Sequence, residues 1–529
     1  MRVATWLSLA LIAVWMGACQ QEGGAFVDGD FSGDDDDDGH NGGDADADSD
    51  TDTDSDIDAG SDADSDADSD ADEFEAEEPD PEEPEEPPTC EDAAEVDVTV
   101  FMSADDSNSQ AAPVIVRQLI EAGAGIQGSL RVHEFLNYYR FSYAPADPGR
   151  LRIVPQLHGA EDDPGAAALL VGVVAPALDP ADRRPFNLTF SVDTSGSMTG
   201  VPIENARAVM RAIASQLREG DFVSVVSWDE SVSIALDSLA VSGPDDPDLL
   251  DAIDELEGGG STDLEQGLST AYELAEDNYA AGRLNRVILI SDGGANTGIT
   301  SEELIAAEAD DAEREGIYLV GVGASTAGGY SDSLMDTVTD LGKGSYVYID
   351  SPQEAEAMFT GDRLLANLEV AANDVQLSMT MPAGYLIEEF HGEEISGDPR
   401  EVEPQHLAPN DAMLYHLELR NCTAEANDGS ETFTFAATWE DPFSREERTE
   451  ELSLTAEQMR SGIESQQAKA DAIVAYATAL TAVWDLPEPE QRPYLDAVRA
   501  EVAAVLEVRE GDPDLIEIEG LLETYSARF

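Results

Sequence analysis

Between residues 185 and 350 of the chain, short apolar runs alternate with stretches whose apolar residues recur at helical spacing. The apolar runs, which predict strands, are Phe186–Val192, Phe222–Trp228, Val232–Leu239, Arg286–Ser291, Ile317–Val322 and Tyr346–Ile349. The helical stretches are Ile203–Leu217, Leu249–Leu256, Leu264–Ala281 and Ser301–Glu315, the last with Thr300 as its N-cap. Strands that alternate with helices are typical of a parallel α/β sheet.

The segments on either side follow other patterns. Residues 94–180 contain short apolar alternations and one helical stretch, Val114–Ile120. Residues 365–450 alternate again, and strands are predicted at Val375–Met381, Ala412–Leu419 and Thr432–Trp439. Residues 455–483 predict one amphipathic helix with its apolar residues on one stripe. Two further helices are predicted at 491–508 and 514–525. A helix stripe is typical of a core face, and a partner-binding face on the C-terminal helices 455–525 is the alternative.

Together these patterns predict an α/β fold class. We expect a doubly wound, mostly parallel sheet that is inserted in or flanked by a β-rich domain, with a C-terminal helical region and a disordered acidic N-terminal tether. The predicted parts are a signal peptide (1–19), an Asp/Pro/Glu-rich linker (20–90), a β-rich upstream segment (91–185), the α/β domain (186–360), a second β-rich segment (361–454) and the helical region (455–529). The two β-rich segments are expected to fold together.

The net charge of the chain excludes some classes of function. The chain has 529 residues, with 26 Lys and Arg against 114 Asp and Glu, and a formal net charge of −88. Residues 20–90 hold 31 acidic and no Lys or Arg residues, yet residues 91–529 still carry −58. No basic surface is available to neutralise phosphates, which excludes a nucleic-acid binder that works by counterion release. The same acidity argues against docking on anionic lipid through protein charge.

Residues 20–89 are of low complexity. Asp34–Asp38 is a pure acidic run, and from Asp44 to Asp72 nearly every second residue is Asp. Such like charges repel, and too little apolar surface is present to offset chain entropy, so we expect an extended, disordered spacer. The acidic run also matches the first half of an EF-hand calcium loop, but Ala45 stands where that loop needs a Glu. Nonspecific condensation of cations is the alternative.

The N-terminus predicts export. Arg2 precedes an apolar run from Trp6 to Val14, and this run is too short to span a bilayer stably. Met16-Gly17-Ala18-Cys19 resembles a bacterial lipobox, in which Cys19 would carry a lipid, and an ordinary secretory signal is the alternative. Gln20 after the cysteine favours the outer membrane by resemblance to sorting rules of Gram-negative cells. We therefore expect a lipid-anchored protein of the bacterial cell envelope, on its surface or periplasmic face.

Two cysteines remain besides Cys19. An oxidising compartment permits Cys90 and Cys422 to form a disulfide, and two free thiols are the alternative.

Oxygen-bearing side chains follow three predicted elements of the α/β domain. Asp193-Thr194-Ser195-Gly196-Ser197 comes directly after a strand, Thr262 follows the glycines 258–260 in what the sequence predicts as a flexible loop, and Asp292 follows the strand 286–291. Ligands of open α/β sheets bind at the carboxyl ends of strands. Hydroxyls and carboxylates are ligands for a hard divalent cation. For residues 193–197 alone, an Asx turn with a helix cap is the alternative.

This pattern resembles the von Willebrand factor type A domain with its metal-ion-dependent adhesion site. The resemblance implies that Ser195 and Ser197 bind the ion through their hydroxyls, that Thr262 binds directly in one state, that Asp292 binds mostly through water, and that Asp193 orients water and hydroxyls. Magnesium is the expected metal, with calcium or manganese as substitutes. Leu130–Tyr139, the preceding residues 104–107 and Val116-Arg117, and Ser291–Gly298 resemble the bacterial YfbK-like group, in which the A domain lies between an upstream segment and a β-rich and helical part.

Such a metal is expected to lack one ligand, which a Glu or Asp of a partner protein supplies. The main hypothesis is thus a metal-dependent, adhesion-type protein-binding module, anchored in the envelope by lipid only. The alternative is an envelope scaffold or assembly factor. Catalysis is not expected, because no nucleophile elbow, P-loop, HExxH motif or zinc-type Cys/His cluster is present. The six histidines are predicted to be scattered surface or packing residues.

Overall fold

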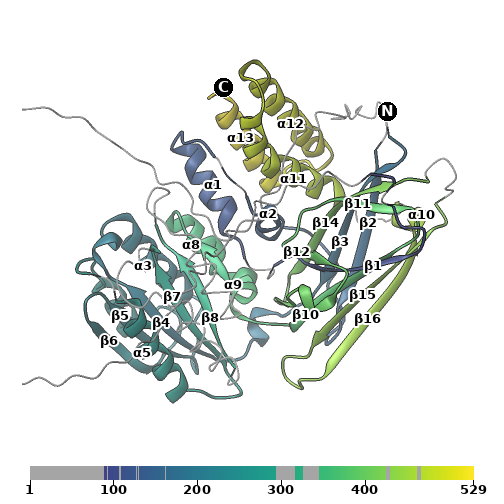
Figure 1. Cartoon of the computed structure of the whole chain (residues 1–529). Helices are drawn as coiled ribbons and strands as arrows, with labels where there is room; N and C mark the ends of the chain where they lie inside the picture. Colours follow the sequence, from purple (N-terminus) through teal and green to yellow (C-terminus); the bar gives the residue numbers. More distant parts are fainter. Residues whose placement is uncertain are drawn as a thin grey trace, which may run out of the picture. The chain divides into compact units, whose positions relative to one another are not determined.

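The computed structural model describes residues 89–529 except 92, 106–108, 127, 129, 161–162, 262, 294–315, 326–344, 424–428 and 461–465. Cys19, the acidic tether up to residue 88, Thr262 and the predicted helix Ser301–Glu315 lie outside the described residues. Within the described part, a six-stranded α/β sheet, a pair of antiparallel sheets and a group of C-terminal helices pack together (Figure 1).

The α/β sheet has the strand order β6-β5-β4-β7-β8-β9. Its strands are β4 (Phe186–Asp193), β5 (Phe222–Trp228), β6 (Val232–Ala240), β7 (Leu284–Ser291), β8 (Ile317–Gly323) and β9 (Tyr346–Tyr348). Only β6 pairs antiparallel, with β5. Every residue of β4, β7 and β8 is buried, which is why these strands read as continuous apolar runs. The described helices of this domain are α3 (Val201–Ala214), α4 (Pro247–Asp254), α5 (Leu264–Asp277), α8 (Pro352–Met358) and α9 (Gly361–Leu368).

The two antiparallel sheets contain strands from both sides of the α/β domain. One has the order β12-β1-β10-β15-β16, with β13 paired to β10, and the other the order β11-β14-β3-β2. Their strands are β1 (Val98–Ser103), β2 (Arg152–Gly159), β3 (Ala166–Val174), β10 (Ala372–Met381), β11 (Tyr385–Phe390), β12 (Glu394–Ser396), β13 (Gln405–Leu407), β14 (Ala412–Asn421), β15 (Thr432–Glu440) and β16 (Glu447–Thr455). Because β1 pairs with β10 and β3 with β14, the α/β domain is an insertion between β3 and β10. Apolar side chains of both sheets share one core.

The predicted fold class is confirmed by this arrangement. The helices outside the α/β domain are α1 (Ala111–Glu121), α2 (Val132–Tyr138), α10 (Ala456–Arg460), α11 (Gln467–Ala482), α12 (Glu488–Val508) and α13 (Pro513–Ser526). Short 3-10 turns lie at Pro180–Asp182, Gly196–Met198, Pro399–Glu401 and Val483–Asp485. No helix within the described ranges is long and apolar enough to traverse a lipid bilayer.

The prediction of one amphipathic helix over 455–483 is wrong. β16 extends to Thr455, and α10 and α11 are separate helices. Moreover, α11 buries residues on several sides, including Ala472, Val474, Ala479 and Leu480, in a core shared with the α/β domain. A helix with apolar residues all round is a buried helix rather than one with a single core-facing stripe. The alternative of a partner-binding stripe is therefore not available on α11.

Cys90 and Cys422 are joined by a disulfide with a Cα–Cα distance of 5.4 Å. Near it, the backbone N–H of Gly384 donates to Ala94 and that of Cys422 donates to Gly384. The bridge thus ties the start of the described chain to the end of β14, across a sequence separation of 332 residues.

One partly buried cation connects the upstream helices α1 and α2 with the α/β domain and the C-terminal helix α13. The guanidinium of Arg117 in α1 lies 3.0 Å from Asp350 and 2.7 Å from Glu354 of the α/β domain, and 3.1 Å from Glu517 of α13. It also donates to the hydroxyl of Tyr138 in α2 at 2.9 Å. Burial alone would lower the pKa of Arg117, but Tyr138, Glu354 and Asp350 raise that pKa above its usual range. Arg117 therefore remains charged, and it neutralises acidic groups that would otherwise repel each other.

We expect the substitution Arg117→Met to lower the free energy of unfolding by about 3–5 kcal/mol, because removing one partner leaves buried carboxylates unpaired. Arg499→Met is the matched control. Arg499 also contacts two carboxylates, at 3.5 and 2.9 Å, but its side chain and theirs are 31–66% exposed. Its loss should cost at most about 1 kcal/mol. Urea denaturation of both variants measures the difference, and equal losses would contradict the role given to Arg117.

The disulfide predicts that Cys90 and Cys422 resist alkylation in the native, unreduced chain and become alkylated after reduction. Peptide mapping by mass spectrometry should recover the two cysteines in one linked peptide before reduction. Loss of the bridge in Cys422→Ser should lower the free energy of unfolding by roughly 2–4 kcal/mol. Two thiols that react in the native chain would show that the bridge does not form.

Candidate metal centre

The buried strand β4 ends in Asp193, whose side chain is held by residues of two elements. The Asp193 carboxylate accepts a hydrogen bond from the backbone N–H of Ser195 at 2.8 Å and another from the Ser291 hydroxyl at 2.8 Å. β4 and β7 run parallel and in register up to Val192 and Ile290, so their carboxyl ends meet at one edge of the sheet. This register brings Asp193 beside Ser291, although 98 residues separate them in the sequence.

The turn after β4 brings two hydroxyls together. Thr194 anchors the turn, because both its backbone N–H and its hydroxyl donate to the carbonyl of Trp228, at 2.8 and 3.0 Å. Beyond it, the oxygens of Ser195 and Ser197 lie 3.0 Å apart. Ser195 is buried, whereas Ser197 is exposed. The hydrogen bonds of Thr194 thus fix the position of the two serines in the domain, while Ser197 is open to solvent.

The glycines 258–260 are held against this turn, so their interpretation as a flexible loop is corrected. Gly259 donates to the carbonyl of Thr194 at 2.8 Å, and Gly196 donates to the carbonyl of Gly260 at 3.0 Å. A Cβ atom on Gly258 would lie 2.8 Å from the backbone nitrogen of Thr199. Glycine is therefore required for the close approach of the two backbones. Thr262, two residues further on, is outside the described residues.

Asp292 directly follows β7 and is 3% exposed. Burial is the main cause that raises the pKa of Asp193, and repulsion by Asp292 adds to it, while hydrogen bonds from Ser195 and Ser291 act against it. Two buried carboxylates that repel each other are unfavourable unless a cation or a proton compensates them.

The structure thus brings four of the five predicted metal-site residues, Asp193, Ser195, Ser197 and Asp292, to the carboxyl edge of one sheet. All their donor atoms are oxygens, and the carboxylates are buried while one hydroxyl faces solvent. This donor set fits a hard divalent cation such as Mg²⁺.

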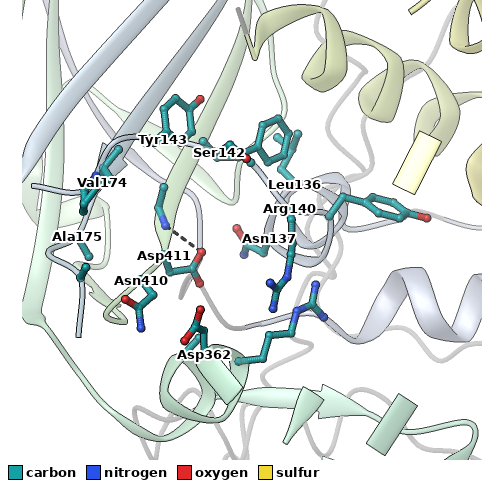
Figure 2. A pocket seen from close by; sticks show the side chains of 18 of the residues that line it. Leu136, Asn137, Arg140, Ser142, Tyr143, Val174, Ala175, Asp362, Asn410 and Asp411 are labelled. Atoms are coloured by element: carbon teal, nitrogen blue, oxygen red, sulfur yellow. Dashed lines mark hydrogen bonds between the residues drawn. The ribbon is translucent and has the colours of Figure 1, made fainter. Parts of the chain in front are cut away.

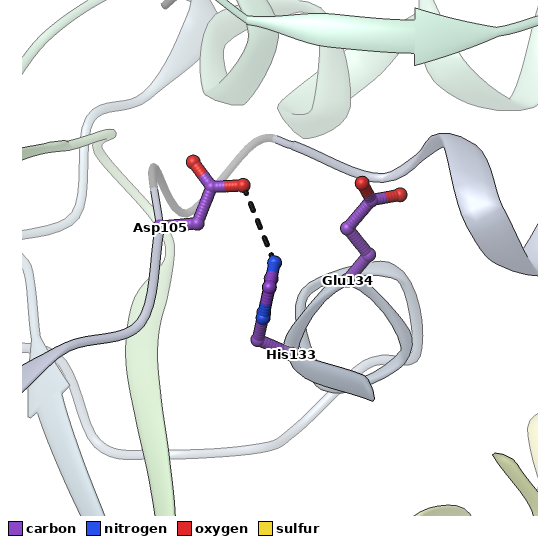
Figure 3. A group of neighbouring side chains, drawn as sticks. All are labelled: Asp105, His133 and Glu134. Atoms are coloured by element: carbon purple, nitrogen blue, oxygen red, sulfur yellow. Dashed lines mark ion pairs between the residues drawn. The ribbon is translucent and has the colours of Figure 1, made fainter. Parts of the chain in front are cut away.

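Sequence reasoning missed two groups that combine a histidine with two carboxylates. Glu389, His391 and Glu418 form one, and Asp105, His133 and Glu134 form the other. In the second group, Figure 3 shows the ring of His133 directed at Asp105, with Nε2 3.6 Å from Oδ2 of Asp105. Glu134 accepts hydrogen bonds from the backbone of Ala112 at the start of α1 and from Arg131. His133 and Glu134 are adjacent in the sequence, but Asp105 comes close to them only because the chain folds. The spacing of the three residues in the sequence therefore gives no signal of the group.

A cavity of about 310 Å³ lies elsewhere, among α2, α9 and the start of β14. Figure 2 shows Arg140, Asp362 and Asp411 among the charged side chains that line it. Arg363 lines the cavity as well, so the charges of two cationic and two anionic side chains cancel in its lining. None of Asp193, Ser195, Ser197 and Asp292 lines this cavity, so the cavity is separate from the candidate metal centre.

Comparison with known proteins identifies the inserted domain. The family model of the von Willebrand factor type A domain matches residues 187–360. The chain is 27% identical over 292 residues to the uncharacterized protein YfbK of Escherichia coli K12, over 53% of this chain and 49% of that protein. It is 26% identical over 187 residues to the uncharacterized protein sll0103 of Synechocystis, over 35% of this chain and 43% of that protein. The matches span about half the length of these curated relatives or less.

One solved structure, described as von Willebrand factor type A from Catenulispora acidiphila, is similar with a TM-score of 0.40 and 15% identity, covering 73% of this chain and 91% of that one.

We expect His133 to make stability depend on pH. Burial lowers the pKa of His133 to about 3, and repulsion by Arg131 adds to this effect. The unfolded chain binds a proton at His133 below a pH of about 6.5 and the folded chain does not. The free energy of unfolding should therefore fall as the pH drops from about 6 to 4, by up to roughly 1.4 kcal/mol per pH unit from this residue.

Urea denaturation of wild type, His133→Gln and the control His40→Gln, which changes a histidine of the acidic N-terminal segment, checks the prediction across this pH range. The slope should be smaller in His133→Gln than in wild type, and unchanged in His40→Gln. Identical slopes in all three chains would show that His133 is not buried in its neutral form.

Proposed function

Because this chain is a von Willebrand factor type A domain protein of the YfbK-like group, we propose that it is an envelope-anchored module that binds a partner protein through a divalent metal ion. The observation that carries this proposal is the cluster of Asp193, Ser195, Ser197 and Asp292 at the carboxyl edge of the sheet, where the two serine oxygens lie 3.0 Å apart. Domains of this family typically bind a divalent metal and take part in protein interaction or adhesion.

In this proposal Ser195 and Ser197 hold the ion through their hydroxyl oxygens, and Asp193 and Asp292 hold it mainly through water. Thr262 is proposed as a further ligand. Asp193 keeps the backbone of Ser195 in place, since its carboxylate accepts the N–H of that residue. Magnesium is the proposed metal, with calcium and manganese as substitutes, because all donors are oxygens. When bound, the ion supplies an electrophilic centre with one coordination position for a ligand from outside.

The proposed ligand is a Glu or Asp side chain of the partner. A carboxylate that binds a poorly neutralised ion forms a short, charge-assisted contact. Residues 91–529 carry a formal charge of −58, which repels a uniformly acidic partner at long range. A partner with a basic patch around one acidic anchor therefore fits best. No contact with nucleic acid is proposed.

The site of action is proposed from the N-terminal sequence. Residues 1–19 have the features of a lipoprotein signal ending at Cys19, and the acidic segment that follows would hold the folded part away from the membrane. Protease treatment of intact cells distinguishes an external adhesin, which would be removed, from a periplasmic scaffold or assembly factor, which would be spared.

We expect the tagged full-length chain to recover its partner from envelope extract with Mg²⁺, and to lose it with EDTA or in Asp193→Ala. Asp251→Ala, which removes an exposed acid of α4, is the matched control and should bind like wild type. Calorimetric titration with Mg²⁺ should show uptake at the site in wild type and in Asp251→Ala and a loss of it in Asp193→Ala. Equal recovery under all conditions would reject the proposal.

A further inference from the structure

Three of the six histidines in the chain gather on one face of the sheet β11-β14-β3-β2. His416 lies on β14, His158 on β2 and His391 just past the end of β11, and the helix α11 contributes Asp471 beside them. His416 contacts Asp471 at 2.9 Å, and His158 contacts the same carboxylate at 3.3 Å. The histidines are scattered along the sequence, and His391 and His416 are buried as packing residues while His158 is exposed, but strand pairing brings these three together.

Strand register also sets two carboxylates against each other. Glu389 of β11 is paired directly with Glu418 of β14. Like charges directly opposite one another in an antiparallel pair destabilise the sheet. The next residues along the same face are His391 and His416, whose backbones are hydrogen bonded at 3.0 Å. A cation that binds between the two glutamates would convert their repulsion into attraction.

The side chain of His391 is directed into this acidic pair. The residue is 6% exposed, and its Nε2 atom has no hydrogen-bond partner among the described residues. Nε2 lies 3.6 Å from Oε1 of Glu418, and Nδ1 lies 3.8 Å from Oε1 of Glu389. These separations are too long for hydrogen bonds. Only one imidazole nitrogen can bind a given ion, and for Nε2 the 3.6 Å to Glu418 is close to the spacing of about 3.4 Å between two ligands of a tetrahedral ion with bonds of about 2.1 Å.

One ligand atom from each of Glu389, His391 and Glu418 lies within 4.8 Å of the other two. The glutamate side chains are 56% and 50% exposed, so they can rotate inward while the buried imidazole stays fixed. The His416 ring lies 5.2 Å from that of His391, and its contact with Asp471 orients it.

We propose that Glu389, His391 and Glu418 form a second metal site, for a transition-metal ion of the zinc class. One imidazole with two carboxylates suits zinc better than magnesium, which takes oxygen ligands. Three protein ligands at an exposed sheet edge leave a fourth position for water or another ligand. The site belongs to the antiparallel sheets and shares no residue with the metal centre of the A domain, so the two sites are expected to load independently.

The other His/carboxylate group gives weaker support for a site. In the Asp105, His133 and Glu134 group, Glu134 already bonds Arg131 and the start of α1. Its carboxylate is therefore used for structure, whereas Glu389 and Glu418 both point to a half-exposed edge.

The test uses Zn²⁺ and Co²⁺ on the full chain. Competition with a chromophoric chelator should reveal one Zn²⁺ bound more tightly than by the remaining acidic groups, and Co²⁺ at this position should show the visible absorption of a four-coordinate ion. His391→Asn and Glu389→Gln should each weaken this Zn²⁺ binding by about tenfold or more and abolish the Co²⁺ band. Glu389 is exposed, so its variant is expected to fold, and the melting temperature without metal verifies this.

Three controls separate this site from others. His158→Asn removes a neighbouring histidine that is outside the ligand set, His40→Asn removes the histidine of the acidic tether, and Asp193→Ala disables the A-domain centre; each should retain the Zn²⁺ affinity and the Co²⁺ band. Zinc affinity that is the same in wild type and His391→Asn would overturn the proposal. Loss of the band in Asp193→Ala would likewise overturn it.

Discussion

The ion pairs of Arg117 are the interaction on which the packing of the separate segments of this acidic protein depends. Its guanidinium contacts Asp350 and Glu354 of the inserted domain and Glu517 of the C-terminal helices. These carboxylates come from segments more than 230 residues away from Arg117, and burial would force them apart if no cation lay between them. In a chain with 26 basic and 114 acidic residues, each cation in the interior determines which acidic segments can pack together. Lys469 does the same with Asp512 and Asp514 at the start of α13.

The same principle applies to the two metal sites proposed above. At the carboxyl edge of the α/β sheet, Asp193 and Asp292 are buried and repel each other, and Asp193 accepts hydrogen bonds from the backbone of Ser195 and the hydroxyl of Ser291. At the edge of the antiparallel sheet, Glu389 opposes Glu418. A divalent ion can compensate such neighbouring carboxylates. One site offers hydroxyls and the other an imidazole. Because of this difference in ligands, the two sites prefer different metals.

Much of the α/β sheet was predictable because its central strands are buried on both faces and therefore read as apolar runs. The short helix α8 was not predicted, although Ser351 caps it by accepting the N–H of Glu354, a capping pattern visible in the sequence. The helix α11 was predicted with the wrong pattern, because its many alanines are buried on several sides and periodicity distinguishes only two faces. The glycines 258–260 were interpreted as flexible, whereas hydrogen bonds to the turn after β4 hold them.

The sequence by itself determined the oxygen-rich motif at Asp193, Ser195 and Ser197, the apolar strand before it and the extreme acidity of the chain, because each of these is a property of neighbouring residues. Only the tertiary structure decided which carboxylates share a cation, since those partners come from segments up to 400 residues apart. It also decided that β1 and β3 pair with strands beyond the inserted domain, and that three histidines share one sheet face. Strand pairing and register depend on contacts between distant segments, and local composition carries no record of them.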